Sequence, residues 1–303
     1  MTPTTTGLRE SLERDGFVVI PQALGSEQLA KLREAAADVE RLARAGGWPH
    51  IRTVGKQFPP WPSKPNDEEG GIWGVQSLLH PDMPGRDEFA RLYFSETILG
   101  PARELMGDDS GDRGCREEDL VMELLNMLVR PGKAFELRWH RDDIGPDATD
   151  DEELRRLSEP AWHAQWNLAL WDDDSLILVP GSHARARTTQ ERSAGPYETG
   201  LEGEMRVRLR AGDVAFYNNN IFHRGAYDPT KKRLTIHGSV GHVRGGQLRA
   251  RNVLQHDVTW IDRCSFKDAL GSDQRTLDRA EAMRERLIRL GRESGDVGYS
   301  LSG

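Results

Sequence analysis

The sequence predicts an α+β protein with a mainly β core, a sandwich or barrel that helical segments precede and follow in the chain. Two observations lead to this fold class. Short apolar or alternating segments, separated by turn residues, follow one another from about residue 119 to 245. Segments with helical spacing of apolar residues stand before and after them. We therefore expect one domain over 1–303, with a helical and loop part at 1–118, the β core at about 119–245, and a C-terminal extension with a helix at 246–303.

The N-terminal part alternates between helical patterns and turn residues. Apolar residues recur at helical spacing after Ser26, a plausible N-cap, and again after Asp87. The segment between these two patterns is rich in proline and glycine, and such a long loop in a compact domain is often functional. The elements expected here are a helix at 7–15, a strand at 17–20, a helix from Ser26 to about Ala45, a loop at 46–86 and a helix from Asp87 to about Leu105.

The β core is expected to consist of short strands, because proline, glycine and aspartate place turns between its apolar segments. The acidic segment 145–160 is expected to be a surface loop or a short helix. After the core, a final helix begins at Ser272 or Asp273 and runs to about Leu290. The expected strands are 121–129, 135–141, 163–171, 176–179, 205–209, 213–217 and 233–240.

The composition argues against several classes of protein. Hydrophobic residues make up 37% of the chain and charged residues 30%, which is ordinary for a globular protein. The net charge of -8 argues against binding to nucleic acid or an anionic membrane. The two cysteines, Cys115 and Cys264, can form neither a disulfide framework nor a zinc site. Without a signal peptide or an apolar span, we expect a cytoplasmic protein with a small-molecule partner, and its oligomeric state is not indicated.

His140 and Asp142 stand one residue apart in a segment with a strand-like pattern. Residues at this spacing point to the same face of a strand, so an imidazole and a carboxylate could bind one ion there. His223 could supply a second imidazole, and two histidines with one carboxylate are the ligands expected of non-haem Fe(II) oxygenases. The pattern His-x-Asp is common by chance, and a surface or core role is the alternative for each residue. Asp143 is the competing carboxylate, which a continuous strand would point to the opposite face.

Arg233 opens the apolar segment 233–240, ten residues after His223. An unpaired buried charge is costly, so an arginine at this place needs an anionic partner. A dicarboxylate bound to the metal would supply that partner through a two-point contact. A structural salt bridge is the alternative.

These features, in their order and spacing, resemble the phytanoyl-CoA dioxygenase family of Fe(II)/2-oxoglutarate-dependent oxygenases. The resemblance covers roughly residues 10–245 and implies a double-stranded β-helix, a cupin-type jelly roll with iron at one mouth. It implies that His140, Asp142 and His223 are the catalytic iron ligands, and that Arg233 binds the distal carboxylate of 2-oxoglutarate. The residues that carry it are Arg14-Asp15-Gly16-Phe17-Val18-Val19-Ile20, Trp139-His140-Arg141-Asp142, Leu178-Val179-Pro180-Gly181-Ser182-His183, Gly212-Asp213-Val214, His223 and Arg233.

Other polar residues are expected near the co-substrate. Strand alternation places Asn126 and Asn167 where they could contact the proximal carboxylate, although a surface position or an internal hydrogen bond is equally open. Thr235 shares a face with Arg233 and could assist it, and His237 is more often a core histidine.

The chain departs from the family pattern at three places. Asp172-Asp173-Asp174 stands where the family usually has Asn-Gly, and Asn167 appears in place of a tryptophan often found near 2-oxoglutarate. Tyr227-Asp228 stands where an asparagine is common. These changes leave the metal and arginine positions intact and bear on the substrate pocket.

The expected activity is hydroxylation of a small, partly apolar metabolite with release of succinate and CO2. Related halogenases have a small residue in place of the aspartate, so Asp142 favours hydroxylation, while desaturation, epoxidation and rearrangement stay open. One alternative is a cupin-like metal-dependent isomerase or hydrolase, which would not need Arg233. Another is a non-catalytic ligand-binding protein on the same fold, against which the intact set of ligands argues. The candidate substrate-lining residues are Trp61, Trp73 and Trp139.

Overall fold

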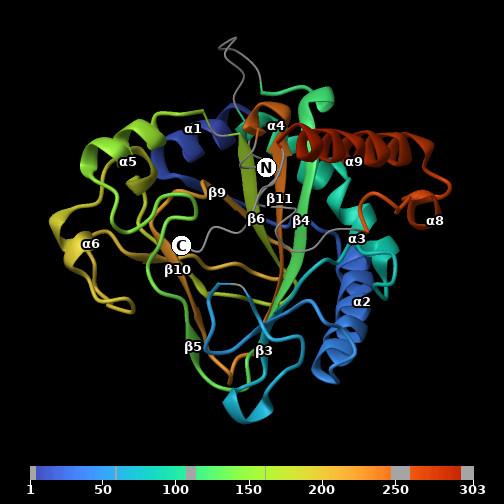
Figure 1. Ribbon diagram of the computed structural model, residues 1–303, viewed down its shortest axis with the longest axis horizontal. Helices are drawn as coiled ribbons and strands as arrows, with labels where there is room; N and C mark the ends of the chain where they lie inside the picture. The colour runs from blue at the N-terminus through green and yellow to red at the C-terminus, as the bar shows by residue number, and fades with distance from the viewer. Residues whose placement is uncertain (1–4, 59, 107–113, 161, 247–259, 295–303) are drawn as a thin grey trace.

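Two antiparallel β-sheets form the centre of the molecule in the computed structural model, which describes residues 5–58, 60–106, 114–160, 162–246 and 260–294 (Figure 1). The larger sheet has the order β1 (Phe17–Ile20), β9 (Val214–Tyr217), β6 (His163–Ala169), β11 (Leu234–His242), β4 (Leu120–Val129), β3 (Ile72–Val75) and β2 (Ile51–Thr53). The smaller sheet has the order β5 (Phe135–Glu136), β10 (His223–Tyr227), β7 (Leu176–Leu178) and β8 (Met205–Arg206). This pair of sheets agrees with the jelly roll that the resemblance implied.

Helices flank the sheets on more than one side. The α-helices are α1 (Thr5–Asp15), α2 (Ser26–Arg44), α3 (Arg86–Tyr93), α4 (Glu96–Leu105), α5 (Asp150–Leu157), α6 (Thr189–Ser193), α8 (Lys267–Leu270) and α9 (Gln274–Ser294). The 3-10 helices are η1 (Asp67–Glu69), η2 (Glu117–Asp119), η3 (Ser182–Ala184) and η4 (Val243–Gly245). Figure 1 shows α2, α3 and α9 on the side of β4, and α5 and α6 on the opposite side, near β10. None of the described helices is long and apolar enough to cross a membrane.

The main apolar core lies between the larger sheet and the helices that cover it. The amphipathic patterns of α2 and α9 bury their apolar faces there, as expected for helices on a sheet. Polar residues of the central strands instead lie on the face toward the smaller sheet, and the candidate site is built on that face. Fully buried core residues from five elements are Leu32, Phe89, Met127, Phe216 and Met283.

The prediction of a continuous loop at 46–86 is wrong for two short segments. Ile51–Thr53 and Ile72–Val75 are strands that pair with each other, and β3 also pairs with β4 at the edge of the larger sheet. The part predicted as helical and loop, 1–118, therefore contributes β1, β2 and β3 to the larger sheet. Strands of three or four residues owe their stability to their neighbours, and their own pattern is too short to indicate them.

Other predicted elements also differ from the structure. The strand expected at 135–141 is β5 alone, followed by an isolated bridge. The strand β10 was not expected, because His-Arg-Gly-Ala-Tyr lacks an apolar alternation. The helix expected from Asp87 to Leu105 is divided at Ser95, whose backbone is extended. The N-cap of α2 is Gly25, and Ser26 is the first residue of the helix.

Candidate active site

The three predicted ligand residues meet in space. His140 and His223 are partners in an isolated antiparallel bridge, and the backbone N–H of each donates to the carbonyl of the other at 3.0 Å. Asp142 Oδ1 lies 3.3 Å from His140 Nε2 and 3.7 Å from His223 Nε2. One ligand atom from each residue lies within 4.8 Å of the others. The three side chains can therefore converge on one ion, and we call them the triad.

The far side of each imidazole is held by the backbone. His140 Nδ1 lies 2.8 Å from the carbonyl oxygen of Arg138, and His223 Nδ1 lies 2.8 Å from that of Ile221. A carbonyl only accepts, so both Nδ1 atoms carry the proton and both Nε2 lone pairs face Asp142. Histidine ligands of metals are oriented in this way by hydrogen bonds to their other ring nitrogen.

The protonation states of the triad suit a cation. Burial, helped by the neighbouring His140, lowers the pKa of His223 to about 4, so its ring is neutral at pH 7. Burial alone would raise the pKa of Asp142, but His223 and His140 outweigh it and hold the pKa of this carboxyl well below its ordinary value. Two neutral imidazoles and one carboxylate are the donor set that Fe(II) takes in oxygenases, so the residues present fit this metal.

A loop after β9 positions the carboxylate of Asp142. This residue lies in a bend rather than in a strand, and its N–H donates to the carbonyl of Asn219 at 3.0 Å. The side-chain amide of Asn219 donates to the carboxylate of Asp143, and the N–H of Asp143 donates to Asn220 Oδ1 at 3.2 Å. Asp143 is therefore tied to this loop and is not part of the triad.

Two glutamines near the triad were not predicted as site residues. Gln57 accepts from the N–H of Arg138 at 2.9 Å, and its amide nitrogen lies 3.3 Å from His140 Nδ1. Gln165 hydrogen bonds to Asp142 and lowers its pKa, and its Oε1 lies 3.2 Å from His163 Nε2. Gln57 lies in the loop that was expected to be functional, and Gln165 lies in β6, two residues before Asn167. Nothing in the sequence marked either side chain as a partner of the triad.

The Pro-Gly-Ser-His turn that carries the family resemblance also supports His223. Ser182 Oγ accepts from the N–H of Phe222 at 2.8 Å, directly before His223. His183 Nε2 donates to the carbonyl of Glu13 at 3.1 Å, which ties the turn to α1. Gly16, with φ of 79°, lies so close that a Cβ would be 2.4 Å from His183 Nδ1. The motifs far apart in the sequence are therefore one packing unit behind the triad.

Arg233 is buried, and the described residues occupy most of its guanidinium. Its Nε donates to Asp173 Oδ2 at 2.6 Å. Its Nη2 donates one hydrogen to Ser175 Oγ at 3.2 Å and the other to Thr235 Oγ1 at 3.0 Å. Nη1 donates to the carbonyl of Val129 at 3.2 Å. An arginine has five N–H donors, so one Nη1 hydrogen is left. The salt bridge that was the alternative for this residue is present, and its contact with 2-oxoglutarate stays a prediction.

The other residues expected at the co-substrate lie in one cross-strand row. Asn126 and Asn167 are both partners of His237 across β11, and Asn167 Oδ1 lies 2.8 Å from His237 Nδ1. Asn126 Oδ1 accepts from the N–H of Ser77 at 3.1 Å, while its buried Nδ2 has no hydrogen-bond partner among the described residues. Asn126 thus keeps a free donor for a ligand, and Asn167 has its oxygen engaged.

The three predicted tryptophans have different surroundings. Trp139 stacks on Phe222 with ring centroids 5.0 Å apart, and its Nε1 donates to the carbonyl of Glu198, so it packs behind the triad. Trp73 stacks on Tyr227 with centroids 5.7 Å apart, inside the space between the sheets. Trp61 packs against the same apolar cluster as Trp73.

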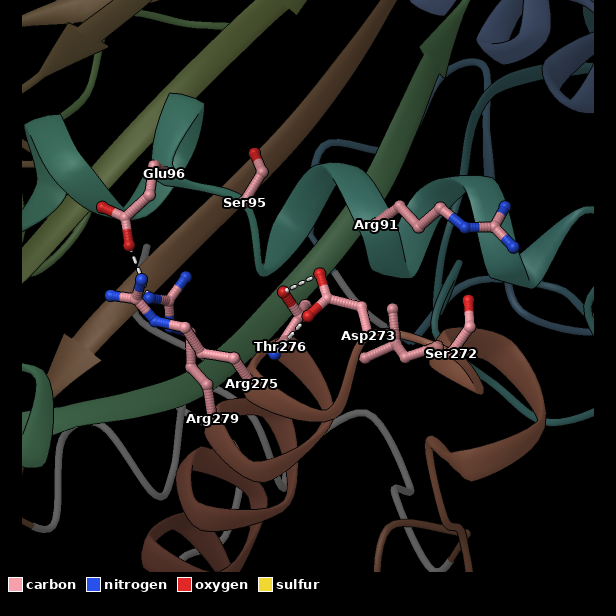
Figure 2. Close-up of a pocket in the computed structure, with 9 residues that line it drawn as sticks. Arg91, Ser95, Glu96, Ser272, Asp273, Arg275, Thr276 and Arg279 are labelled. Atoms are coloured by element: carbon pink, nitrogen blue, oxygen red, sulfur yellow. Dashed lines mark hydrogen bonds and ion pairs between the residues drawn. The ribbon is translucent and has the colours of Figure 1, made fainter.

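A separate pocket lies between α4, the start of α9 and the end of α3, and Figure 2 shows the side chains that line it. Its volume is about 400 Å³. None of the triad lines it, and most of its charged groups are engaged with each other or with neighbours. Arg279, for example, pairs with Glu96 and Glu117, and Asp273 accepts from Thr276. The pocket is therefore not the candidate active site.

Comparison with known proteins gives relatives in sequence. An ectoine dioxygenase from Stutzerimonas stutzeri (strain A1501) is 26% identical over 247 residues, which are 73% of this chain and 71% of that protein. Another from Streptomyces avermitilis is 25% identical over 187 residues, which are 60% of this chain and 52% of that protein.

Solved structures show the same fold. EctD from S. alaskensis with 2-oxoglutarate and 5-hydroxyectoine superposes with a TM-score of 0.55 and 19% identity over 80% of this chain and 78% of that one. AviO1 from Streptomyces viridochromogenes Tue57 superposes with a TM-score of 0.54 and 19% identity, over 80% of this chain and 96% of that one. The predicted fold class, an α+β jelly roll with flanking helices, is confirmed. Residues 12–233 also match the family described as phytanoyl-CoA dioxygenase (PhyH), so the chain belongs to the phytanoyl-CoA dioxygenase family.

Proposed function

We propose that this non-haem Fe(II)- and 2-oxoglutarate-dependent oxygenase hydroxylates a C–H bond of a small, partly apolar metabolite. The observation that carries the proposal is the triad, in which the far side of both imidazoles is fixed and three ligand atoms face one another. No described residue favours the isomerase, hydrolase or non-catalytic alternatives.

His140, Asp142 and His223 would hold the iron. Bound Fe(II) supplies the redox chemistry, in which 2-oxoglutarate is decarboxylated to succinate and one oxygen atom of O2 enters the substrate. Both imidazoles would bind through Nε2, because each Nδ1 proton is already engaged with a carbonyl. The carboxylate of Asp142 occupies the position that is vacant in related halogenases, which supports hydroxylation over halogenation.

Arg233, Asn126, Asn167 and Thr235 are the proposed contacts of 2-oxoglutarate. The remaining Nη1 hydrogen of Arg233 and the free Nδ2 of Asn126 are donors suited to carboxylate oxygens. Thr235 Oγ1 accepts from Arg233 and so fixes the plane of the guanidinium. Trp73 and Trp61 would supply an apolar wall for the substrate. The names of the ectoine dioxygenases are in line with a small-molecule substrate.

The test is 2-oxoglutarate turnover by protein loaded anaerobically with Fe(II) and then exposed to O2. We expect some members of a metabolite panel to raise succinate release, and mass spectrometry to find a product heavier by one oxygen atom. His140→Ala should lose both iron affinity and succinate release. The proposal fails if the wild-type protein does not bind 2-oxoglutarate and His140→Ala keeps its affinity for iron. Substrate conversion without succinate, with Arg233→Ala fully active, would support an isomerase or hydrolase instead.

A further inference from the structure

Arg52 of β2 is a second cation on the inner face of the larger sheet. Arg52 is paired with Gly74 of β3, and Gly74 is paired with Leu128 of β4. Leu128 is in turn paired with Thr235 of β11. Directly paired residues share a face, so Arg52 lies on the same face as Thr235, the residue that holds Arg233. A Cβ on Gly74 would lie 3.0 Å from Arg52 Cδ. The glycine therefore leaves the room in which the arginine side chain crosses β3.

Trp73 stacks on Tyr227, and the Cζ of Arg233 lies 4.8 Å from the Tyr227 ring centroid. The guanidinium of Arg52 lies at this same aromatic cluster. Its Cζ is 5.2 Å from the ring centroid of Trp73 and 5.4 Å from that of Trp61, so two indole faces hold it in place. Burial lowers the pKa of Arg52 below its ordinary value, and the nearby Tyr227 and Asp142 oppose this shift without cancelling it. Burial lowers the pKa of His237, and the charge of Arg52 is the next largest cause that lowers it.

Arg52 has no acidic partner in the part of the chain that the structure describes. No ion pair or hydrogen bond of its guanidinium is found there, and its buried Nε has no acceptor. Arg233, by contrast, has Asp173 and three further acceptors. A cation taken from water without a partner is destabilising, and such a group is retained where a ligand supplies the missing charge.

We propose that Arg52 binds a carboxylate of a small molecule held beside the triad. The planar fork of its N–H groups fits the two oxygens of a carboxylate, and the tryptophans fix the plane of that fork. This inference rests on the proposed function, because the carboxylate belongs either to 2-oxoglutarate, through its distal end, or to the molecule that is hydroxylated. Both sources share one chemistry, and matched probes separate them.

The first arm tests the co-substrate. Nickel-loaded wild-type protein and the variants Arg52→Gln and Arg52→Lys are titrated by calorimetry with 2-oxoglutarate and with 2-oxopentanoate, which has the same length but no distal carboxylate. If Arg52 binds the distal carboxylate, Arg52→Gln weakens 2-oxoglutarate binding by about tenfold or more and leaves 2-oxopentanoate unchanged, because a charge-assisted pair is lost. Arg52→Lys keeps the charge without the fork and should recover part of the loss.

The second arm tests the substrate side. Protein loaded with nickel and 2-oxoglutarate is titrated with hexanoate and with 1-hexanol, observed by ligand-based NMR. If the carboxylate comes from the substrate, Arg52→Gln leaves 2-oxoglutarate binding unchanged and weakens hexanoate binding about tenfold, with no effect on hexanol. Unchanged affinities in both arms would overturn the inference.

Arg33→Gln is the matched control. Arg33 also lies over an indole, 4.9 Å from the centroid of Trp171, but it donates to the carbonyl of Leu170 on the outside of the sheet. Its replacement should alter no probe affinity. Arg52→Gln should not lower the thermal unfolding temperature, because the desolvation cost of a cation without an acidic partner outweighs its contacts with the two indoles. A lower unfolding temperature together with weaker binding of all probes, 2-oxopentanoate included, would indicate a structural role and overturn the inference. Wild-type protein that binds metal but not 2-oxoglutarate would contradict the proposed function instead.

Discussion

The triad and Arg233 lie on the same interior space but have opposite relations to the surrounding protein. Protein partners hold the Nδ1 atoms of His140 and His223 and leave the Nε2 atoms and Asp142 Oδ1 facing one another. At Arg233, protein partners already use four of the five N–H donors. The triad therefore directs its ligand atoms to a position where a cation could bind, whereas the charge of Arg233 is largely neutralised by the protein.

The difference centres on Asp173, which stands in the turn where the family usually has Asn-Gly. Its carboxylate is buried and pairs with Arg233 at 2.6 Å. Burial alone would raise the pKa of Asp173, but Arg233 and Ser175 outweigh it and keep this carboxyl ionised. A dicarboxylate that approaches Arg233 must share the guanidinium with this anion. The departure from the family pattern thus changes the electrostatics around Arg233 and leaves the triad unchanged.

Removal of a triad ligand should have the largest effect. Asp142→Ala leaves two imidazoles without a negative charge, so we expect the affinity for Fe(II) or Ni(II) to fall by at least about 100-fold and succinate release to stop. Metal titration by calorimetry measures the affinity. Asp143→Asn is the matched control and should stay within a few-fold of wild type, because Asp143 pairs with the Asn219 side chain. A larger loss in Asp143→Asn than in Asp142→Ala would reverse the ligand assignment.

The second prediction concerns the anion that neutralises Arg233. Asp173→Asn leaves a buried guanidinium without its charge partner, and the free energy of unfolding should fall by about 3–5 kcal/mol in denaturant titrations. The freed cation should bind 2-oxoglutarate several-fold more tightly, so the ligand should raise the unfolding temperature more in this variant than in wild type. Weaker 2-oxoglutarate binding in Asp173→Asn would mean that Asp173 orients Arg233 for the ligand rather than competing with it.

The sequence predicts the triad residues but not the way in which they meet. Asp142 was placed beside His140 by strand alternation, yet the chain is not a strand there. The bridge between His140 and His223 and the backbone contact with Asn219 bring the carboxylate into place instead. Residue type and family pattern identify ligands because metal chemistry restricts the choice of side chain. The local backbone depends on contacts far along the chain, which no short pattern contains.

Arg52 and Gln57 show a different limit. Both lie in the segment expected to be a loop, and neither residue type is restricted to a site. Arg52 becomes a candidate only because no acid among the described residues pairs with it, which is a property of the packed structure. The unusual length of that segment predicted a functional loop but could not indicate which residue lies near the triad, where the structure places Gln57 Nε2 3.3 Å from His140 Nδ1.

The third prediction tests the packing behind the triad. Gly16 adopts φ of 79°, and a Cβ there would lie 2.4 Å from His183 Nδ1. Gly16→Ala should therefore lower the free energy of unfolding by about 2 kcal/mol, from backbone strain and displacement of the ring. Gly7→Ala is the control, since a Cβ at this position of α1 would meet nothing within 4 Å. This variant should raise the free energy of unfolding by about 0.5–1 kcal/mol. Equal stability of the two variants would show that this contact does not support the metal-binding end.

The smallest expected effect is a pH dependence that arises at His237, between the two ends. Burial, and next the charge of Arg52, lowers the pKa of His237 to about 3. In the unfolded chain an ordinary histidine takes up a proton below about pH 6.5, while the folded ring stays neutral until about pH 3. The unfolded state therefore binds more protons in this window, and stability falls as the pH falls. Between pH 7 and pH 5 the loss should be about 1 kcal/mol, because the full difference in proton binding corresponds to about 2 kcal/mol and the ring is partly exposed.

His237→Asn should remove this part of the pH dependence, measured as the difference between denaturant unfolding at pH 7 and at pH 5 without metal. Arg52→Gln should raise the pKa of the folded His237 ring, followed by NMR titration of its imidazole without metal, because the cation that opposes its protonation is gone. If His237→Asn keeps the full pH dependence, the loss of stability comes from His223, whose pKa is lowered to about 4. If Arg52→Gln has no effect, its guanidinium is not close enough to the Asn126–His237–Asn167 row to act on it, and the cation at this end is Arg233 alone.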